Sequence, residues 1–104
     1  MTTRNLVLTD GNIRNAHIYL RSVRDLLPAD AIGGPDKGEA ARSLTVSFDG
    51  GETVESDVAG DKMILRERGA VRRFLAEHRA QAGDEMVLGF SGDRTISVSF
   101  RRAR

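Results

Sequence analysis

The sequence predicts a mainly β single domain with one or two short helices, and three observations support this fold class. Apolar and polar residues alternate over several short segments, which is typical of strands with one buried face. Turns rich in glycine and aspartate separate these segments. The chain has 104 residues, enough for one hydrophobic core. Many short strands suggest a barrel or a sandwich, and a chain this short favours a barrel, whose closure hides the strand edges.

The expected strands follow the alternating segments. Their ranges are 5–9, 16–20, 44–48, 52–56, 63–66, 86–90 and 95–100. The polar stretch 10–15 is predicted to be a long loop between the first two strands. Asp49-Gly50-Gly51 and Ser91-Gly92-Asp93 are predicted to be the turns of two hairpins. The stretch 57–62 interrupts the alternation and is predicted to be a second polar connection.

Helical periodicity is clear in one segment only. Residues 69–80 place Val71, Phe74, Leu75 and His78 on one helical face, so a helix is predicted there. Residues 21–27 form a short helical candidate that ends before Pro28, and residues 28–41 are predicted to be a loop.

Composition excludes several classes of protein. The chain has no cysteine, which removes disulfides, thiolate catalysis and thiolate zinc sites. It has neither an apolar run long enough to span a bilayer nor a signal-peptide pattern, so we expect no membrane partner and a cytoplasmic location. The net charge is only +1, yet all sixteen cations except Lys37 and Lys62 are arginine, a residue suited to phosphates and guanine edges.

Catalytic constellations are absent from the sequence. Only two histidines are available as a base, and His78 is expected on the apolar face of the helix, while His17 is expected to point outward from a strand. Asp61 and Lys62 are adjacent, so their side chains would diverge on a strand and do not form a nuclease site. We therefore expect no enzymatic activity, no metal site and no cofactor.

The two polar connections carry the residues suited to nucleic acid. Arginine matches guanine, amides match adenine, and acids can accept a hydrogen bond from cytosine. Such loops also occur on inert surfaces. From the residues alone, a small barrel that docks onto a partner protein through the same exposed loops stays open as the alternative, and the low net charge favours it.

A resemblance extends over nearly the whole chain. The segments that carry it are 8–20, Leu27-Pro28, 32–34, Ser56-Asp57, Asp61-Lys62, 66–68, 71–74 and 82–84. In this order they resemble the DNA-binding pseudobarrel family, which includes the plant B-three domains and the DNA-recognition domains of EcoRII-type bacterial restriction endonucleases. The bacterial branch is the closer match. The resemblance implies a seven-stranded open β-barrel that grips the major groove with two loops.

By position, the two loops would be an N-arm, residues 9–17, and a C-arm, residues 56–68. The residues expected to contact double-stranded DNA are Asn12, Arg14, Asn15, His17, Asp57, Asp61, Lys62, Arg66 and Arg68. Restriction enzymes of this branch carry a nuclease domain, which this chain lacks. A standalone regulator associated with the nucleoid, a specificity subunit acting through a separate nuclease or regulatory protein, and an excised domain therefore all stay open. Sensing of cytosine methylation is a further expectation for a reader without its own nuclease.

Overall fold

The computed structural model describes residues 2–103, apart from the Lys37 side chain. In the labels used here, α and β mark α-helices and strands, and η marks 3-10 helices. The elements are β1 (Thr2–Val7), α1 (Asp10–Asn15), η1 (Arg21–Leu26), η2 (Ala29–Ala31), β2 (Ile32–Gly33), η3 (Lys37–Glu39), β3 (Leu44–Phe48), β4 (Thr53–Ser56), β5 (Val58–Ala59), β6 (Ile64–Leu65), α2 (Arg68–Glu77), β7 (Glu85–Phe90) and β8 (Thr95–Arg101). The predicted mainly β class is confirmed, with a few short helices where one or two were expected.

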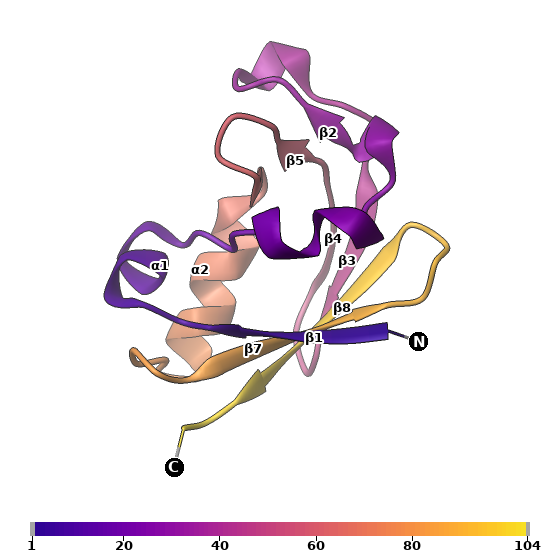
Figure 1. Cartoon of the computed structure of the whole chain (residues 1–104). Coiled ribbons are helices and arrows are strands. Elements are labelled where there is room, and N and C mark those ends of the chain that lie inside the picture. The colour runs from indigo at the N-terminus through magenta and orange to yellow at the C-terminus, as the bar shows by residue number, and fades with distance from the viewer. Residues whose placement is uncertain (1, 104) are drawn as a thin grey trace.

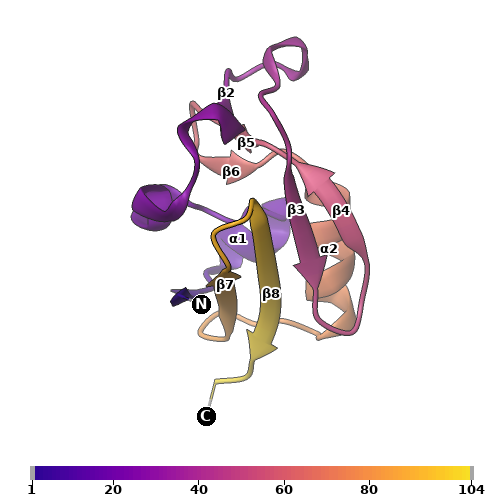
Figure 2. The ribbon, with the colours of Figure 1, turned by 90° about the vertical axis from the view of Figure 1, so that its right-hand side faces the viewer.

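Five strands form the larger sheet, in the order β1-β7-β8-β3-β4 (Figures 1 and 2). β8 pairs antiparallel with β7 and parallel with β3, so it lies in the middle of the sheet. The alternation predicted for residues 44–48 is confirmed: Leu44, Val46 and Phe48 of β3 are buried, and the residues between them are partly exposed. Both predicted hairpins are present.

A smaller sheet of three strands, in the order β2-β5-β6, lies above the larger one in Figure 2. β2 runs parallel to β5, and β6 runs antiparallel to it. The described residues thus form eight strands in two open sheets, and the expected seven-stranded open barrel is not confirmed. Sequence reading missed β2 and β5 because strands of two residues are too short to show alternation.

Helix α2 covers the buried face of the larger sheet, as the ring of Phe74 shows. This ring lies 5.2 Å from the ring of Phe48 and 6.4 Å from that of Phe100, measured between centroids. His78 stacks on Phe100 at the end of the helix and is half-buried, close to the position its periodicity predicted. The helix predicted at 69–80 is confirmed with slightly shifted ends. Among residues 2–103, no helix has both the length and the apolar character needed to cross a membrane.

Residues 28–41, predicted to be a loop, contain η2, β2 and η3. This segment is held against β5, because the Gly60 N–H donates to the Gly33 carbonyl oxygen at 2.9 Å. A Cβ atom added at position 60 would overlap that same oxygen. The absence of a side chain at Gly60 therefore permits the contact between the two segments.

We expect Gly60→Ala to lower the free energy of unfolding by about 2 kcal/mol or more, since the clash is with backbone and can be relieved only by separating β2 from β5. Urea denaturation measures the change. Gly38→Ala is the matched control, because nothing lies within 4 Å of a Cβ at that position. Equal losses in the two variants would contradict the close approach as the cause.

Candidate nucleic-acid interface

The centre of the predicted N-arm is a helix and not a loop. Thr9 caps α1: its hydroxyl accepts from the Asn12 N–H at 3.1 Å, and the Asn12 side-chain oxygen accepts from the Thr9 N–H at 2.9 Å. Ala16, in the left-handed conformation with φ 54°, ends the helix. The oxygen of Asn12 is thereby committed to the fold, while Arg14 and Asn15 lie exposed at the end of α1.

The strand predicted over 16–20 is absent, and the outward direction predicted for His17 is wrong. Only Tyr19 makes a bridge, to Ile64, and His17 is just 7% exposed. Ala16, Ile18 and Leu20 do enter the core, so their spacing imitated a strand. His17 is buried as well, and its ring contacts the side chains of Tyr19 and Arg68.

The C-arm consists of β5, β6 and the tight turn between them. Met63, in the left-handed conformation with φ 55°, closes the turn by donating its N–H to the Ala59 carbonyl oxygen at 2.8 Å. Asp61 and Lys62 are exposed at the tip, as expected for contact residues. The strand predicted at 63–66 is limited to Ile64–Leu65.

Asp57 and Arg66 bind each other at the base of the C-arm. Arg66 donates from Nε to Asp57 Oδ1 at 2.6 Å and from Nη2 to Oδ2 at 3.0 Å. Its guanidinium also donates to the carbonyl oxygens of Gly34 and Asp36, at 2.8 and 3.1 Å. Asp57 is only 3% exposed. Although both residues were expected at the DNA surface, the structure places them in a buried clasp that fixes the segment around η3 to the C-arm.

The charge of the buried Asp57 is stabilised by this clasp. Burial alone raises the pKa of the carboxyl group, but hydrogen bonds from Arg66 and from the Ala41 N–H outweigh it and leave the pKa below its ordinary value. Asp57 is therefore ionised at neutral pH and supports the C-arm from below.

The two arms meet at His17. Its Nε2 atom lies 3.1 Å from Nη1 of Arg68, the first residue of α2. Burial, then the positive charges of Arg68 and Lys62, lower the pKa of the His17 imidazole. The Leu20 N–H also donates to the Met63 carbonyl oxygen at 2.7 Å. Figure 1 shows α1 and the β5–β6 turn on the same side of the molecule.

The arginines divide into paired and unpaired groups. Within residues 2–103 the ion pairs are Arg4–Asp25, Arg42–Asp30, Arg66–Asp57, Arg73–Glu52, Arg94–Asp30 and Arg102–Asp84. The unpaired cations on the arms and on the adjacent part of α2 are Arg14, Lys62, Arg68 and Arg72. Outside the arms, Arg21, Arg24, Arg79 and Arg101 also lack an acidic partner among the described residues. We use the name arm face for the exposed set Arg14, Asn15, Lys62, Arg68 and Arg72.

Sequence reasoning missed two residues near this face. Arg72 follows Arg68 by four residues on α2, so the two side chains share one face of the helix. Tyr19 is 44% exposed, and its hydroxyl lies 3.0 Å from His17 Nδ1. The spacing of the two arginines was a usable signal for Arg72, whereas Tyr19 was hidden in the apparent strand alternation.

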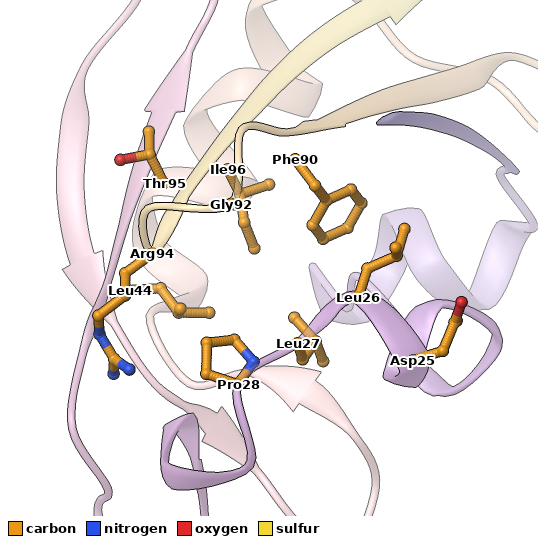
Figure 3. A pocket seen from close by; sticks show the side chains of 10 residues that line it. All are labelled: Asp25, Leu26, Leu27, Pro28, Leu44, Phe90, Gly92, Arg94, Thr95 and Ile96. Atoms are coloured by element: carbon orange, nitrogen blue, oxygen red, sulfur yellow. The ribbon is translucent and has the colours of Figure 1, made fainter. Parts of the chain in front are cut away.

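A hollow of about 250 Å³ lies elsewhere, between the end of η1 and the β7–β8 turn (Figure 3). Mostly apolar side chains line it, among them Leu27, Leu44, Phe90 and Ile96. Arg94 at its rim is bound to Asp30 at 2.6 Å. None of the residues expected to contact DNA lines this hollow, so it is separate from the arm face.

Comparison with known proteins gives a match in fold. The sequence matches no protein-family model and no curated protein. A solved structure does match it. The N-terminal domain of Helicobacter pylori LlaJI.R1 superposes with a TM-score of 0.63, covering 97% of this chain and 88% of that one, at 8% sequence identity. The two chains therefore share a fold over nearly their whole lengths.

Proposed function

We propose that this protein binds double-stranded DNA in the major groove through the arm face, without catalysing a reaction. The observation that carries the proposal is the set of unpaired cations Arg14, Lys62, Arg68 and Arg72, contributed by α1, the β5–β6 turn and α2. Phosphate binding requires cations that are not already neutralised, because affinity arises from replacing the counterions of DNA.

The distribution of charge explains how a net charge of +1 is compatible with this function. Six arginines pair with five acids of the chain itself, Asp30 being shared by Arg42 and Arg94, so these arginines contribute little field at a distance. The cations of the arm face have no such partner among residues 2–103. Asp61, beside Lys62, is the exposed acid of the C-arm tip and would accept a hydrogen bond from a cytosine amino group.

The fold supports the proposal through its likeness to the LlaJI.R1 domain, which fits the resemblance to restriction-enzyme recognition domains. On this reading α1 and the β5–β6 turn would enter the groove as the two arms. The protein would act in the cytoplasm, on the nucleoid, alone or with a separate nuclease or regulatory protein.

Docking of a partner protein is the competing function, and one observation favours it. Among the described residues the large exposed apolar side chains are Val7 and Tyr19, and both line a groove of about 300 Å³ beside α1. Two side chains are few for a specific protein interface, which buries roughly 1,000 Å² or more. The unpaired cations therefore favour DNA.

Selection from a randomised duplex pool, with and without cytosine methylation, tests the proposal at about 50 mM and about 200 mM salt. We expect retention that weakens with salt and enrichment of a short sequence. Enrichment only in the methylated pool would identify a methylation sensor. The methyl group of the modified cytosine would then need an apolar contact. Met63 and Leu65 of the C-arm are only 1% and 2% exposed and cannot provide it, so it would come from Tyr19. No retention at low salt would refute DNA binding and favour the docking function.

A further inference from the structure

A chain of hydrogen bonds fixes the guanidinium group of Arg68. Nη1 of Arg68 lies 3.1 Å from His17 Nε2, and His17 Nδ1 lies 3.0 Å from the Tyr19 hydroxyl. An arginine nitrogen can only donate, so Nε2 must accept and the neutral ring carries its proton on Nδ1. That proton is donated to the Tyr19 oxygen. Each member of the chain is thus oriented by the next.

This chain of hydrogen bonds is buried at His17 and exposed to solvent at Arg68. His17 is 7% exposed, and its ring meets that of Tyr19 edge-on at 5.4 Å. Arg68 is exposed, and its Nε–Nη2 edge makes no hydrogen bond to any described residue. This edge offers two parallel N–H donors held in a fixed direction. By contrast, the side chains of Arg14 and Lys62 make no hydrogen bond within residues 2–103.

We infer that Arg68 reads a guanine edge, that His17 and Tyr19 are its positioning residues, and that Arg14, Lys62 and Arg72 contact phosphates. The inference rests on the proposed function and deepens it. Guanine presents two adjacent acceptors, O6 and N7, in the major groove, which match the two donors of an arginine fork. A donor pair already held in place loses less freedom on binding than a mobile side chain does, so it discriminates better between bases.

The charges around His17 make this reading dependent on pH. His17 contacts Arg68 of α2 through Nε2 and the Tyr19 hydroxyl through Nδ1, and the positive charge of Lys62 in the β5–β6 turn also acts on the ring. Burial and these two cations lower the pKa of the imidazole from 6.5. Because the unfolded chain takes up the proton more readily, the stability contributed by the neutral ring is complete above pH 6.5 and falls as the pH drops below it. Protonation removes the acceptor of Arg68 and places a cation beside it.

The first test replaces each guanine of the selected duplex, one at a time, with 7-deazaguanine, which lacks the N7 acceptor. For one position we expect the parent protein to bind about 10-fold more weakly. Arg68→Ala should be insensitive to that replacement and should discriminate about 5- to 150-fold less between the selected duplex and a scrambled one. Arg72→Ala, the matched control one turn along α2, should weaken binding to both duplexes equally.

The second test concerns the positioning residues. In the parent, discrimination should be constant above pH 6.5 and should decrease as the pH falls below that value, while binding to the scrambled duplex should not decrease. His17→Gln, whose amide oxygen can accept from Arg68, should retain discrimination and lose this pH dependence. Tyr19→Phe keeps the ring and should reduce discrimination about 2- to 10-fold. If the His17 variant fails to fold, which thermal unfolding would reveal, Tyr19→Phe still tests the chain of hydrogen bonds.

The outcomes separate this inference from the proposed function. If the parent retains no duplex at low salt, the proposed function fails. If the parent discriminates between duplexes but Arg68→Ala keeps both the discrimination and the sensitivity to 7-deazaguanine, the assignment of Arg68 is wrong while DNA binding stands.

Discussion

Arg66→Ala should lower the free energy of unfolding by about 3 kcal/mol, because it leaves the carboxylate of Asp57 buried without its charged partner. We take the lower end of the range for breaking a buried ion pair, because Asp57 is only 3% exposed but the Arg66 side chain is 18% exposed and therefore partly solvated. The variant also removes the donors to Gly34 and Asp36. Urea denaturation at neutral pH measures the loss.

The matched control is Arg73→Ala, which breaks a similarly short ion pair, to Glu52, on the surface. Water screens that pair, so its loss should be small by comparison. Equal effects of the two substitutions would show that the clasp stabilises the protein no more than a surface pair does.

Acid should reduce the difference in free energy of unfolding between the parent and Arg66→Ala. The pKa of Asp57 is lowered in the folded parent, so its charge adds stability above the ordinary value of 3.8, and this stability is lost as the pH falls through the lowered pKa. In the variant, burial acts against ionisation without Arg66 to oppose it. The two free energies of unfolding should therefore approach each other in acid, leaving only the part contributed by the hydrogen bonds to Gly34 and Asp36. A gap that stays constant with pH would exclude Asp57 as its source.

The double variant Arg14→Glu/Lys62→Glu should bind the selected duplex about 100-fold more weakly at low salt, since each lost phosphate contact costs roughly a factor of ten there. Both side chains are exposed and make no ion pair with any residue that the structure describes, so the fold should be unaffected. In the alanine version, the slope of log Kd against log salt should fall by about 2. Fluorescence anisotropy across a salt series measures both quantities.

A second double variant, Arg4→Glu/Arg42→Glu, changes the net charge by the same amount at arginines that are paired with Asp25 and Asp30 outside the arms. Its effect on binding should be much smaller. If both double variants weaken binding equally, attraction depends on the overall charge and the arm face is not the binding surface.

The sequence was most informative where packing imposes a long, regular pattern. Leu44, Val46 and Phe48 alternate because one face of β3 is buried under α2, and Phe74 recurs at helical spacing because it packs against that face. The short elements α1, β2 and β5 show no such pattern in the sequence. Helix α1 depends on the reciprocal hydrogen bonds of Thr9 and Asn12, in which an asparagine occupies the position more often held by glutamate or glutamine.

The candidate site was only partly predictable for a similar reason. Arg14, Asn15, Asp61, Lys62 and Arg68 are exposed on the arms as expected. Asp57 and Arg66 were expected there because polar residues in a connection resemble ligand contacts. The antiparallel register pairs Val58 with Leu65, so it places Asp57 opposite Arg66 one position further on. Without knowledge of β5, that register was not visible.

The central place of β8 bears on how fast the chain can fold. β1 pairs with β7, Thr2 lying opposite Phe90, and β3 is joined in parallel to β8. Neither pairing can form from neighbouring residues, so large loops must close before the sheet gains stability. Topologies dominated by such distant pairings fold in milliseconds to seconds, more slowly than helical bundles of the same size. During that interval the edges of β3 and β7 stay unpaired and open to association with other chains.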